Sequence, residues 1–410
     1  MYNNSTRTGG PRNGGGRPMY SSRNTNPNRS RNMRGVKQID PRKFINQAIA
    51  PLSEAPFVPV HTFVDFGFDA RLQRNIDAHG YTTPTPIQDG AIQFVIDGRD
   101  IIGHANTGTG KTAAFLLPLL HRHLLKQTHR TLIMVPTREL ASQIEDEFRI
   151  FARGLSLYSA LVVGGASMNR QLSQLQRLPQ FIIGTPGRLK DLIENYGLRL
   201  DEFDSLVLDE ADRMLDMGFI KDIKTILSHM KPEKQTLFLS ATITSEIDSL
   251  IGELLHDPET ISVRKGETAA HVEQNIVELS GNDEKQAKLV ELLGDPEYTK
   301  VLIFGETKHG VQRLADNLNK LGIRAQAIHG NKSQPQRQRA LQDFKTERVQ
   351  ALIATDVAAR GLDIPDVSHV INYDVPHTYE DYVHRIGRTG RAGKSGTALT
   401  FVPRQLSHRF

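Results

Sequence analysis

A glycine-rich segment at residues 105–112 has the residue types needed to bind a polyphosphate. It follows an apolar run at 101–103, and an apolar helix is expected to begin at Ala113. A strand, a glycine-rich turn and a helix N-terminus together present converging backbone N–H groups, which bind phosphate oxygens. Near the end of the segment, Lys111 could reach the terminal phosphates, and the hydroxyl of the next residue, Thr112, could bind Mg²⁺. Ala105 stands where the strict pattern has Gly, and a chance glycine-rich loop is the alternative. We predict a nucleotide site at Ala105, Asn106, Thr107, Gly108, Thr109, Gly110, Lys111 and Thr112.

Four residues with three carboxylates, Asp-Glu-Ala-Asp at 209–212, directly follow the apolar run 205–208. A carboxylate at the C-terminal end of a buried strand can meet a magnesium ion held beside a phosphate loop. We predict that Asp209 makes this contact through water and that Glu210 positions or activates the attacking water. Acidic residues are also common on solvated helix ends. The position of this group, after a strand and about 100 residues beyond the phosphate loop, favours the catalytic interpretation.

A cationic segment at residues 384–391 reads His-Arg-Ile-Gly-Arg-Thr-Gly-Arg. Arginines at every third position, separated by two glycines, form a compact positive turn. Such a turn can act as an arginine finger that neutralises charge in the transition state of phosphoryl transfer. A basic surface patch or an RNA contact is the alternative.

The elements that must position these residues follow an α/β pattern. From Phe63 onward, short apolar runs alternate with helical stretches, which is typical of buried parallel strands joined by crossover helices. Strands are expected at 100–103, 131–135, 181–184, 205–208 and 235–239, and again at 301–304, 325–328, 350–354, 369–372 and 397–401. We therefore predict two α/β domains, at 61–264 and 270–410, joined by a polar linker at 265–269.

The charge of the 410-residue chain is unevenly distributed. Residues 1–34 contain seven Arg and no acid, which leaves 44 basic and 46 acidic residues elsewhere. This tail lacks large aliphatic side chains, so we expect it to be disordered and to bind nucleic acid, with a merely solubilising role as the alternative. Residues 35–60 form a transitional segment, in which a short helix is expected from Asp40 to about Ala50.

The sequence contains neither cysteine nor a long apolar run, and each absence excludes some kinds of protein. The chain has no Cys, which excludes disulfides, thiolate zinc sites and cysteine nucleophiles and fits a reducing compartment. No apolar run approaches the ~20 residues of a membrane span, and the first residues lack the apolar core of a signal peptide. We expect a cytoplasmic protein with no membrane contact.

With these features in place, the chain resembles the DEAD-box RNA helicases of superfamily 2 over residues 61–402. Phe63 lies 17 residues before Gly80, and the segment from Gly80 to Gln88 resembles the adenine-reading Q motif of that family. The resemblance implies that Gln88 pairs with both the donor and the acceptor edge of adenine, which would select ATP over GTP. It also implies that Phe63 packs on the base.

The resemblance further implies RNA contacts that grip the sugar-phosphate backbone. Segments 136–141, 164–165 and 185–188 resemble motifs Ia, GG and Ib, and 240–242 resembles motif III, whose hydroxyls could bond the acidic group. Segments 302–308, 334–337 and 354–363 resemble motif IV, the QxxR element and motif V. Hydroxyls, backbone N–H groups and Arg bind phosphates without reading sequence; each motif alone would also fit an ordinary turn. The implied contacts are Pro136, Thr137, Arg138, Gly164, Gly165, Thr185, Arg188, Arg337, Thr355 and Asp356.

The same match assigns roles around the nucleotide to residues of the second domain. Asp363 would bond the ATP ribose, and Arg388 and Arg391 would face the γ-phosphate. His384 and Arg385 would bridge to the first domain.

The resulting hypothesis is an α/β protein with two tandem RecA-like domains of parallel sheets and a disordered basic tail. It would use ATP and Mg²⁺ to unwind short RNA duplexes or remodel RNA–protein complexes, as a monomer that meets protein partners in ribonucleoprotein complexes. An ATP-gated RNA clamp, a DNA translocase of the same superfamily and a simple basic RNA-binding protein are the alternatives. The adenine-reading element and the acidic group argue against the translocase, and the simple RNA-binding protein leaves both nucleotide elements unexplained.

Overall fold

The computed structural model describes residues 44, 57–105, 108–263, 272–359, 364, 366–390 and 396–404. The predicted tail at 1–34, the short helix expected up to Ala50 and the linker at 265–269 lie outside these residues, apart from Phe44. Each α/β domain is described by itself.

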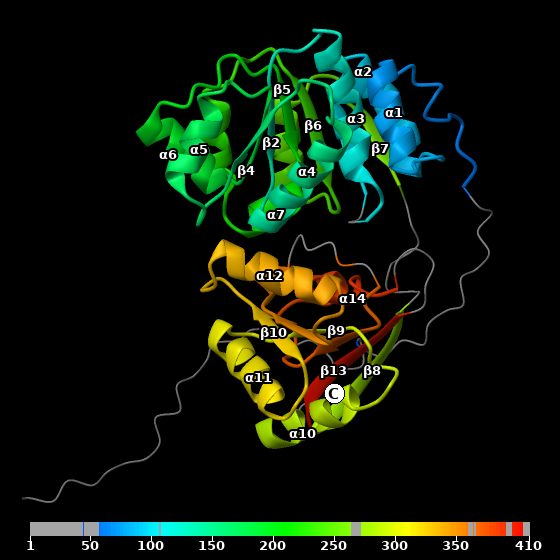
Figure 1. Ribbon diagram of the computed structural model, residues 1–410, viewed down its shortest axis with the longest axis vertical. Coiled ribbons are helices and arrows are strands. Elements are labelled where there is room, and N and C mark those ends of the chain that lie inside the picture. Colours follow the sequence, from blue (N-terminus) through cyan, green and yellow to red (C-terminus); the bar gives the residue numbers. More distant parts are fainter. Residues whose placement is uncertain are drawn as a thin grey trace, which may run out of the picture. The chain divides into compact units, whose positions relative to one another are not determined.

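The first domain is built on a parallel sheet. Within the described residues this sheet has seven strands in the order β3-β4-β2-β5-β6-β1-β7, and every neighbouring pair is parallel. Figure 1 shows β2, β5 and β6 side by side within it. The strands are β1 (Ile101–His104), β2 (Thr131–Met134), β3 (Ser159–Val162), β4 (Phe181–Gly184), β5 (Ser205–Leu208), β6 (Gln235–Ser240) and β7 (Glu259–Ser262). Its central strands are buried on both faces, which is why their sequences are mostly apolar.

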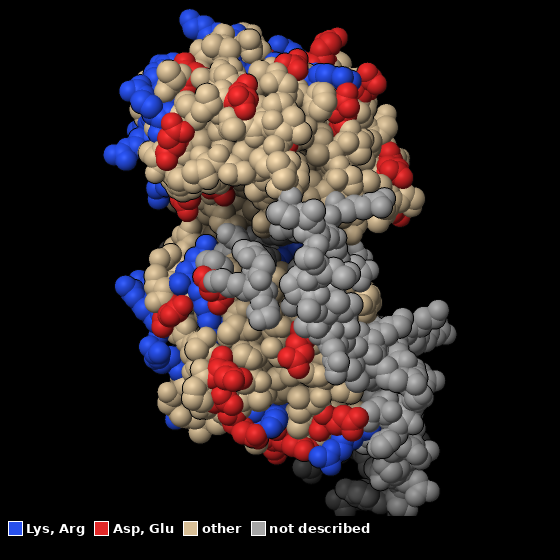
Figure 2. All heavy atoms as spheres, turned by 90° about the vertical axis from the view of Figure 1, so that its right-hand side faces the viewer, with Lys and Arg blue, Asp and Glu red and all other residues tan. Residues whose placement is uncertain are grey.

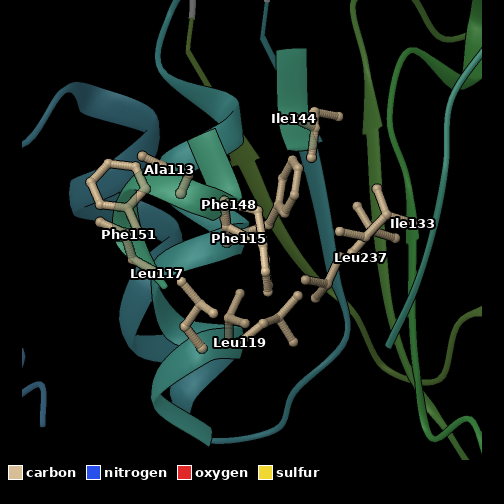
Figure 3. Close-up of a cluster of buried hydrophobic side chains, with 14 of the residues drawn as sticks. Ala113, Phe115, Leu117, Leu119, Ile133, Ile144, Phe148, Phe151 and Leu237 are labelled. Carbon is tan, nitrogen blue, oxygen red and sulfur yellow. The ribbon is translucent and has the colours of Figure 1, made fainter. Parts of the chain in front are cut away.

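Helices cover both faces of this sheet. Successive residues of a strand point to opposite faces, so Ile133 of β2 packs in one apolar cluster and Leu132 in the other. Helices α1 to α4 cover the first face, where Phe115 lies with Phe148 against Leu237 (Figure 3). The helices are α1 (Ala70–Ala78), α2 (Pro86–Ile96), α3 (Lys111–Leu124), α4 (Arg138–Phe151), α5 (Met168–Leu175), α6 (Pro186–Tyr196), α7 (Ala211–Asp216), α8 (Ile220–Leu227) and α9 (Ser245–Leu254), of which α5 to α9 pack on the second face.

The second domain repeats this architecture. In the part of it that the structure describes, six parallel strands follow the order β10-β11-β9-β12-β13-β8. Helices α10 and α11 pack on one face of the sheet, and α12, α13 and α14 pack on the other. The elements are β8 (Val272–Leu279), α10 (Asn282–Leu293), β9 (Val301–Phe304), α11 (Lys308–Lys320), β10 (Ala325–Ile328), α12 (Gln334–Lys345), β11 (Ala351–Ala354), α13 (Asp356–Ala359), β12 (His369–Asn372), α14 (Tyr379–Ile386) and β13 (Gly396–Pro403).

The predicted α/β class with parallel sheets is confirmed, and all ten expected strands are present. The strands that sequence analysis missed are β3, β7 and β8, and each of them lies at an edge of its sheet. Edge strands are partly exposed and carry polar residues; in β7, half-buried and exposed residues alternate. Strands β7 and β8 therefore lack the continuous apolar run by which the central strands were found.

The surface of the described residues carries both signs of charge. On the face shown in Figure 2, Lys and Arg are interspersed with Asp and Glu around both domains. This agrees with the near-equal numbers of basic and acidic residues outside the N-terminal tail. Among the helices of the described ranges, none has the length and apolar character needed to cross a bilayer.

Candidate nucleotide site and RNA-binding edge

The phosphate loop leads from β1 into α3. Gly110 is the residue before the helix and has φ 90°, a left-handed conformation that glycine adopts without strain. The Lys111 side chain is 7% exposed; its ammonium donates to the Ala105 carbonyl oxygen at 2.8 Å and lies 3.9 Å from Asp209 Oδ1. The lysine is therefore held inside the loop, beside the acidic segment. Asn106 and Thr107 lie outside the described residues.

Gln88 connects the Q-motif segment to this loop. Its side chain is buried, Oε1 accepts from the Thr85 backbone N–H at 2.9 Å, and Nε2 donates to the Gly110 carbonyl oxygen at 3.1 Å. A Cβ on Gly110 would lie 2.6 Å from Gln88 Nε2, so glycine is needed there for this approach as well. Phe63 is buried with its ring 5.6 Å from that of Tyr81, and its stacking on adenine stays a prediction.

The acidic segment begins where β5 ends. Asp209 is 2% exposed and accepts from the Glu210 backbone N–H at 2.9 Å. Burial raises the pKa of Asp209 to about 6, while the nearby Lys111 ammonium acts in the opposite direction. Glu210 has φ 52°, a left-handed conformation that strains a non-glycine residue.

The last carboxylate of the segment connects it to β6. Asp212 Oδ2 accepts from the backbone N–H groups of Ala241 and Thr242 at 3.1 and 3.0 Å, and from Thr242 Oγ1 at 3.1 Å. The Ser240 carbonyl oxygen in turn accepts from the Ala105 backbone N–H at 3.1 Å. Strand β6 lies between β5 and β1 in the sheet, so it joins the acidic segment to the phosphate loop. The hydroxyl of Thr242 makes the bond to the acidic group that the sequence suggested.

The predicted RNA motifs of this domain follow β2, β3 and β4, the other half of the same sheet edge. Thr137 begins α4, and its Oγ1 accepts from the Leu140 backbone N–H at 3.3 Å. The Arg138 guanidinium lies against the two glycines after β3: a Cβ on Gly165 would lie 2.1 Å from Nη1, and one on Gly164 would lie 3.0 Å from Nη2. These glycines leave the space that the arginine occupies.

The next motif starts α6 in the same manner. Thr185 precedes the helix, and Arg188 lies in its first turn with Nε 3.5 Å from Asp191 Oδ2. Because the C-terminal ends of parallel strands meet at one edge, Pro136, Thr137, Arg138, Gly164, Gly165, Thr185 and Arg188 share that edge with the nucleotide motifs. Half of the edge therefore carries hydroxyl and arginine groups suited to a phosphate chain, and the other half carries the nucleotide loop.

In the second domain, Thr355 and Asp356 follow β11, and Arg337 lies on α12 after β10. The Asp356 carboxylate is engaged at both oxygens by Arg385, with Nε–Oδ1 at 2.6 Å and Nη2–Oδ2 at 2.7 Å. Arg385 is 2% exposed and also donates to the Asp374 carbonyl oxygen at 2.7 Å. Burial and a bidentate carboxylate partner hold this side chain within its own domain, and its expected bridge to the first domain stays a prediction.

The remaining residues of the cationic segment are only partly described. Arg388 is 4% exposed and follows α14. Arg391 and Asp363 lie outside the described residues.

Comparison with known proteins assigns this arrangement to a family. The model of the DEAD/DEAH box helicase matches residues 85–250, and that of the helicase conserved C-terminal domain matches residues 284–393. The ATP-dependent RNA helicase CshA of Listeria monocytogenes is 44% identical over 84% of this chain and 67% of its own length. The chain belongs to the DEAD/DEAH box helicase family. The CshA protein of Geobacillus kaustophilus is 42% identical over 84% of this chain and 74% of its length.

Solved structures of the family confirm the fold of this DEAD-box chain as two RecA-like domains. The structure of S. cerevisiae Dbp5 bound to RNA and ADP BeF3 covers 85% of this chain and 91% of its own, with a TM-score of 0.73 and 29% identity. That of Mss116p bound to ssRNA and AMP-PNP covers 83% of this chain and 74% of its own, with a TM-score of 0.74 and 30% identity.

The donor set of this DEAD-box chain fits Mg²⁺. Thr112 and Asp209 offer hard oxygen ligands beside the loop, and no cluster of three His, Cys, Asp or Glu side chains able to hold a metal occurs among the described positions. Mg²⁺ is commonly bound through one or two carboxylates together with substrate phosphates rather than by an all-protein cage. A single buried carboxylate and a hydroxyl are therefore sufficient.

Sequence reasoning missed Arg213, which the fold places against Glu210. Its Nη1 donates to Glu210 Oε2 at 2.9 Å, and the two side chains are 5% and 4% exposed. The spacing of three residues at the start of α7 was the available signal, because residues three apart on a helix are neighbours. A charged pair of this burial directly beside the acidic motif indicates a role in holding Glu210.

Proposed function

We propose that this chain is an RNA-stimulated ATPase that uses ATP hydrolysis to unwind short RNA duplexes locally or to remodel RNA–protein complexes. The observation that carries the proposal is the single sheet edge of the first domain. One half of that edge bears the phosphate loop and the acidic segment, and the other half bears the hydroxyl, glycine and arginine motifs. Asp212 connects the acidic segment to β6, the strand beside the phosphate loop.

In the nucleotide half, Gln88 reads adenine and Phe63 packs on the base. Backbone N–H groups of the loop and the Lys111 ammonium bind the phosphates; to do so the ammonium exchanges the Ala105 carbonyl for a phosphate oxygen. Glu210 orients the attacking water and accepts its proton. When bound by Thr112 and Asp209, Mg²⁺ neutralises phosphate charge.

In the RNA half, Thr137, Arg138, Thr185 and Arg188 bind the backbone of one strand through hydroxyl and guanidinium groups, together with the N–H groups of the glycine pair. Contacts of this type carry little sequence information. Arg337, Thr355 and Asp356 add the contacts of the second domain, where Asp356 acts together with its partner Arg385. We therefore propose RNA substrates recognised by backbone shape rather than by sequence.

The second domain also completes the nucleotide site in this proposal. Arg388 and Arg391 neutralise charge on the γ-phosphate in the transition state, and Asp363 bonds the ribose. The protein acts as a cytoplasmic monomer that meets protein partners in ribonucleoprotein complexes, a setting that the cysteine-free composition fits.

The test is the ATPase rate without nucleic acid, with single-stranded RNA and with matched DNA. Strong stimulation by RNA alone is expected. Equal stimulation by DNA would favour a translocase, and no stimulation by either would contradict the RNA half of the proposal. A Glu210→Gln variant should lose about 10²–10⁴-fold in turnover while it still binds ATP and RNA, and undiminished turnover would refute the role of this carboxylate.

An ATP-gated RNA clamp is the second candidate, because the same motifs serve it. Displacement of a short labelled strand separates the two activities. A clamp would retain RNA in the presence of a non-hydrolysable ATP analogue and would not displace the labelled strand at any ATP concentration. A helicase would displace the labelled strand when ATP is present.

A further inference from the structure

A side chain from the start of the chain completes the core of the second domain. Phe44 is 0% exposed and belongs to the same buried cluster as Val272 of β8, Ala398 of β13 and Ile386 of α14. Its ring lies 4.6 Å from that of Tyr382, centroid to centroid, although the two residues are 338 positions apart. An aromatic side chain buries about 150–250 Å² and dominates the energy of the contact that it makes.

Polar groups define the pocket beside this ring. Tyr382 is fully buried, and its hydroxyl lies 2.9 Å from Gln274 Oε1 and 3.4 Å from the Phe44 carbonyl oxygen. Gln274 Nε2 donates to the Val272 carbonyl oxygen at 3.3 Å. Burial raises the pKa of the Tyr382 phenol well above its usual range, so the hydroxyl keeps its proton and remains a donor. The pocket therefore offers an apolar surface for a ring and, beside the backbone of Phe44, a polar side formed by the Tyr382 hydroxyl and Gln274.

The burial of Phe44 is selective. Phe57 is 49% exposed, and Val58 and Val60 are 78% and 83% exposed, although all three precede the first domain as Phe44 does. Apolar character alone thus does not bury a residue in this part of the chain. What distinguishes Phe44 is the pocket formed by Tyr382 and Gln274.

We propose that this pocket is a docking site on the second domain for the aromatic side chain of Phe44, so that the chain is fastened to this domain at residue 44. The site lies on α14, which carries Tyr382 and then His384 and Arg385. When Phe44 docks, its ring packs against the buried side of α14. It also connects the chain to the second domain at a point far in sequence from residues 264–271, which join the two domains covalently. This inference does not rest on the proposed enzymatic activity.

The composition makes a direct test possible, because the chain contains no Trp. Phe44→Trp in the full chain introduces a single indole, whose emission maximum and acrylamide quenching report its exposure. Phe57→Trp is the matched control at an exposed aromatic position. We expect blue-shifted emission and several-fold weaker quenching at position 44 than at position 57. Equal values at the two positions in the folded protein would overturn the proposal.

Two further measurements identify the occupant and the pocket. Shielding at position 44 should be independent of protein concentration, and its loss on dilution would instead mean that a second copy fills the pocket. Tyr382→Phe, which keeps the ring and removes the hydroxyl, should increase quenching at position 44 and leave position 57 unchanged. In hydrogen exchange, Phe44→Ala should increase exchange of α14 but not of α4, and unchanged exchange in α14 would contradict the packing role.

Discussion

Replacing Arg213 by Met should destabilise the first domain strongly, because it removes the guanidinium from a buried carboxylate. Arg213 and Glu210 are 5% and 4% exposed and are joined at 2.9 Å. At an effective dielectric constant of about 20, two unit charges at this separation attract by roughly 6 kcal/mol, most of which offsets their desolvation. Breaking such a pair from one side typically costs about 3–5 kcal/mol. For a domain of this size, that loss lowers the melting temperature by roughly 6–20 °C.

A double-mutant cycle separates the charge effect from the loss of packing. Glu210→Gln in the Arg213→Met background removes the uncompensated charge, so the double variant should be more stable than Arg213→Met alone, with a coupling of about 1–3 kcal/mol. Lys224→Met is the control, because Lys224 and Glu253 form a pair at 2.6 Å in which both side chains are about half exposed. That substitution should change the melting temperature little.

The assay is differential scanning calorimetry of the full chain, together with hydrogen exchange of α7 to assign the transition to the first domain. Two domains need not unfold in one step, so the transition must be assigned before its shift is converted to a free energy. The reasoning is refuted if Arg213→Met is as stable as Lys224→Met, or if Glu210→Gln fails to recover stability in the Arg213→Met background.

Three further outcomes are expected. Gln88→Ala removes the amide that bonds Gly110 and should weaken ATP binding roughly tenfold and abolish the preference for ATP over GTP, as measured by the KM for each nucleotide. Gly165→Ala places a Cβ 2.1 Å from Arg138 Nη1 and should weaken RNA binding without changing basal ATPase activity; Gly154→Ala, at φ +75° with no neighbour within 4 Å, is the matched control in the same RNA titration. Burial lowers the pKa of His123 from its ordinary 6.5 to about 4, so the stability contributed by the neutral ring is present above pH 6.5 and is lost as pH falls toward 4. The loss should amount to about 3 kcal/mol, and melting curves between pH 7 and pH 4.5 should show a flatter pH dependence for His123→Gln, an expectation contradicted by parallel curves.

Local chemistry and central strands could be predicted from the sequence by itself. A strand buried on both faces is apolar over most of its length, so β2, β4, β5 and β9 are visible as apolar runs. The phosphate loop and the acidic segment could be recognised because each depends on neighbouring residues and on the strand before it. Family membership followed from the order of these motifs.

The tertiary structure decided what depends on distant neighbours. Edge strands β7 and β8 are identified by the strands beside them, because their own sequences are only partly apolar. The guanidinium of Arg138 occupies the space left by Gly165, and Arg385 binds Asp356, which lies 29 positions earlier in the chain. Phe44 fills a pocket beside a residue 338 positions away. Such contacts join residues that sequence spacing cannot bring together, because burial and pairing partners are set only when the strands have taken their order in the sheet.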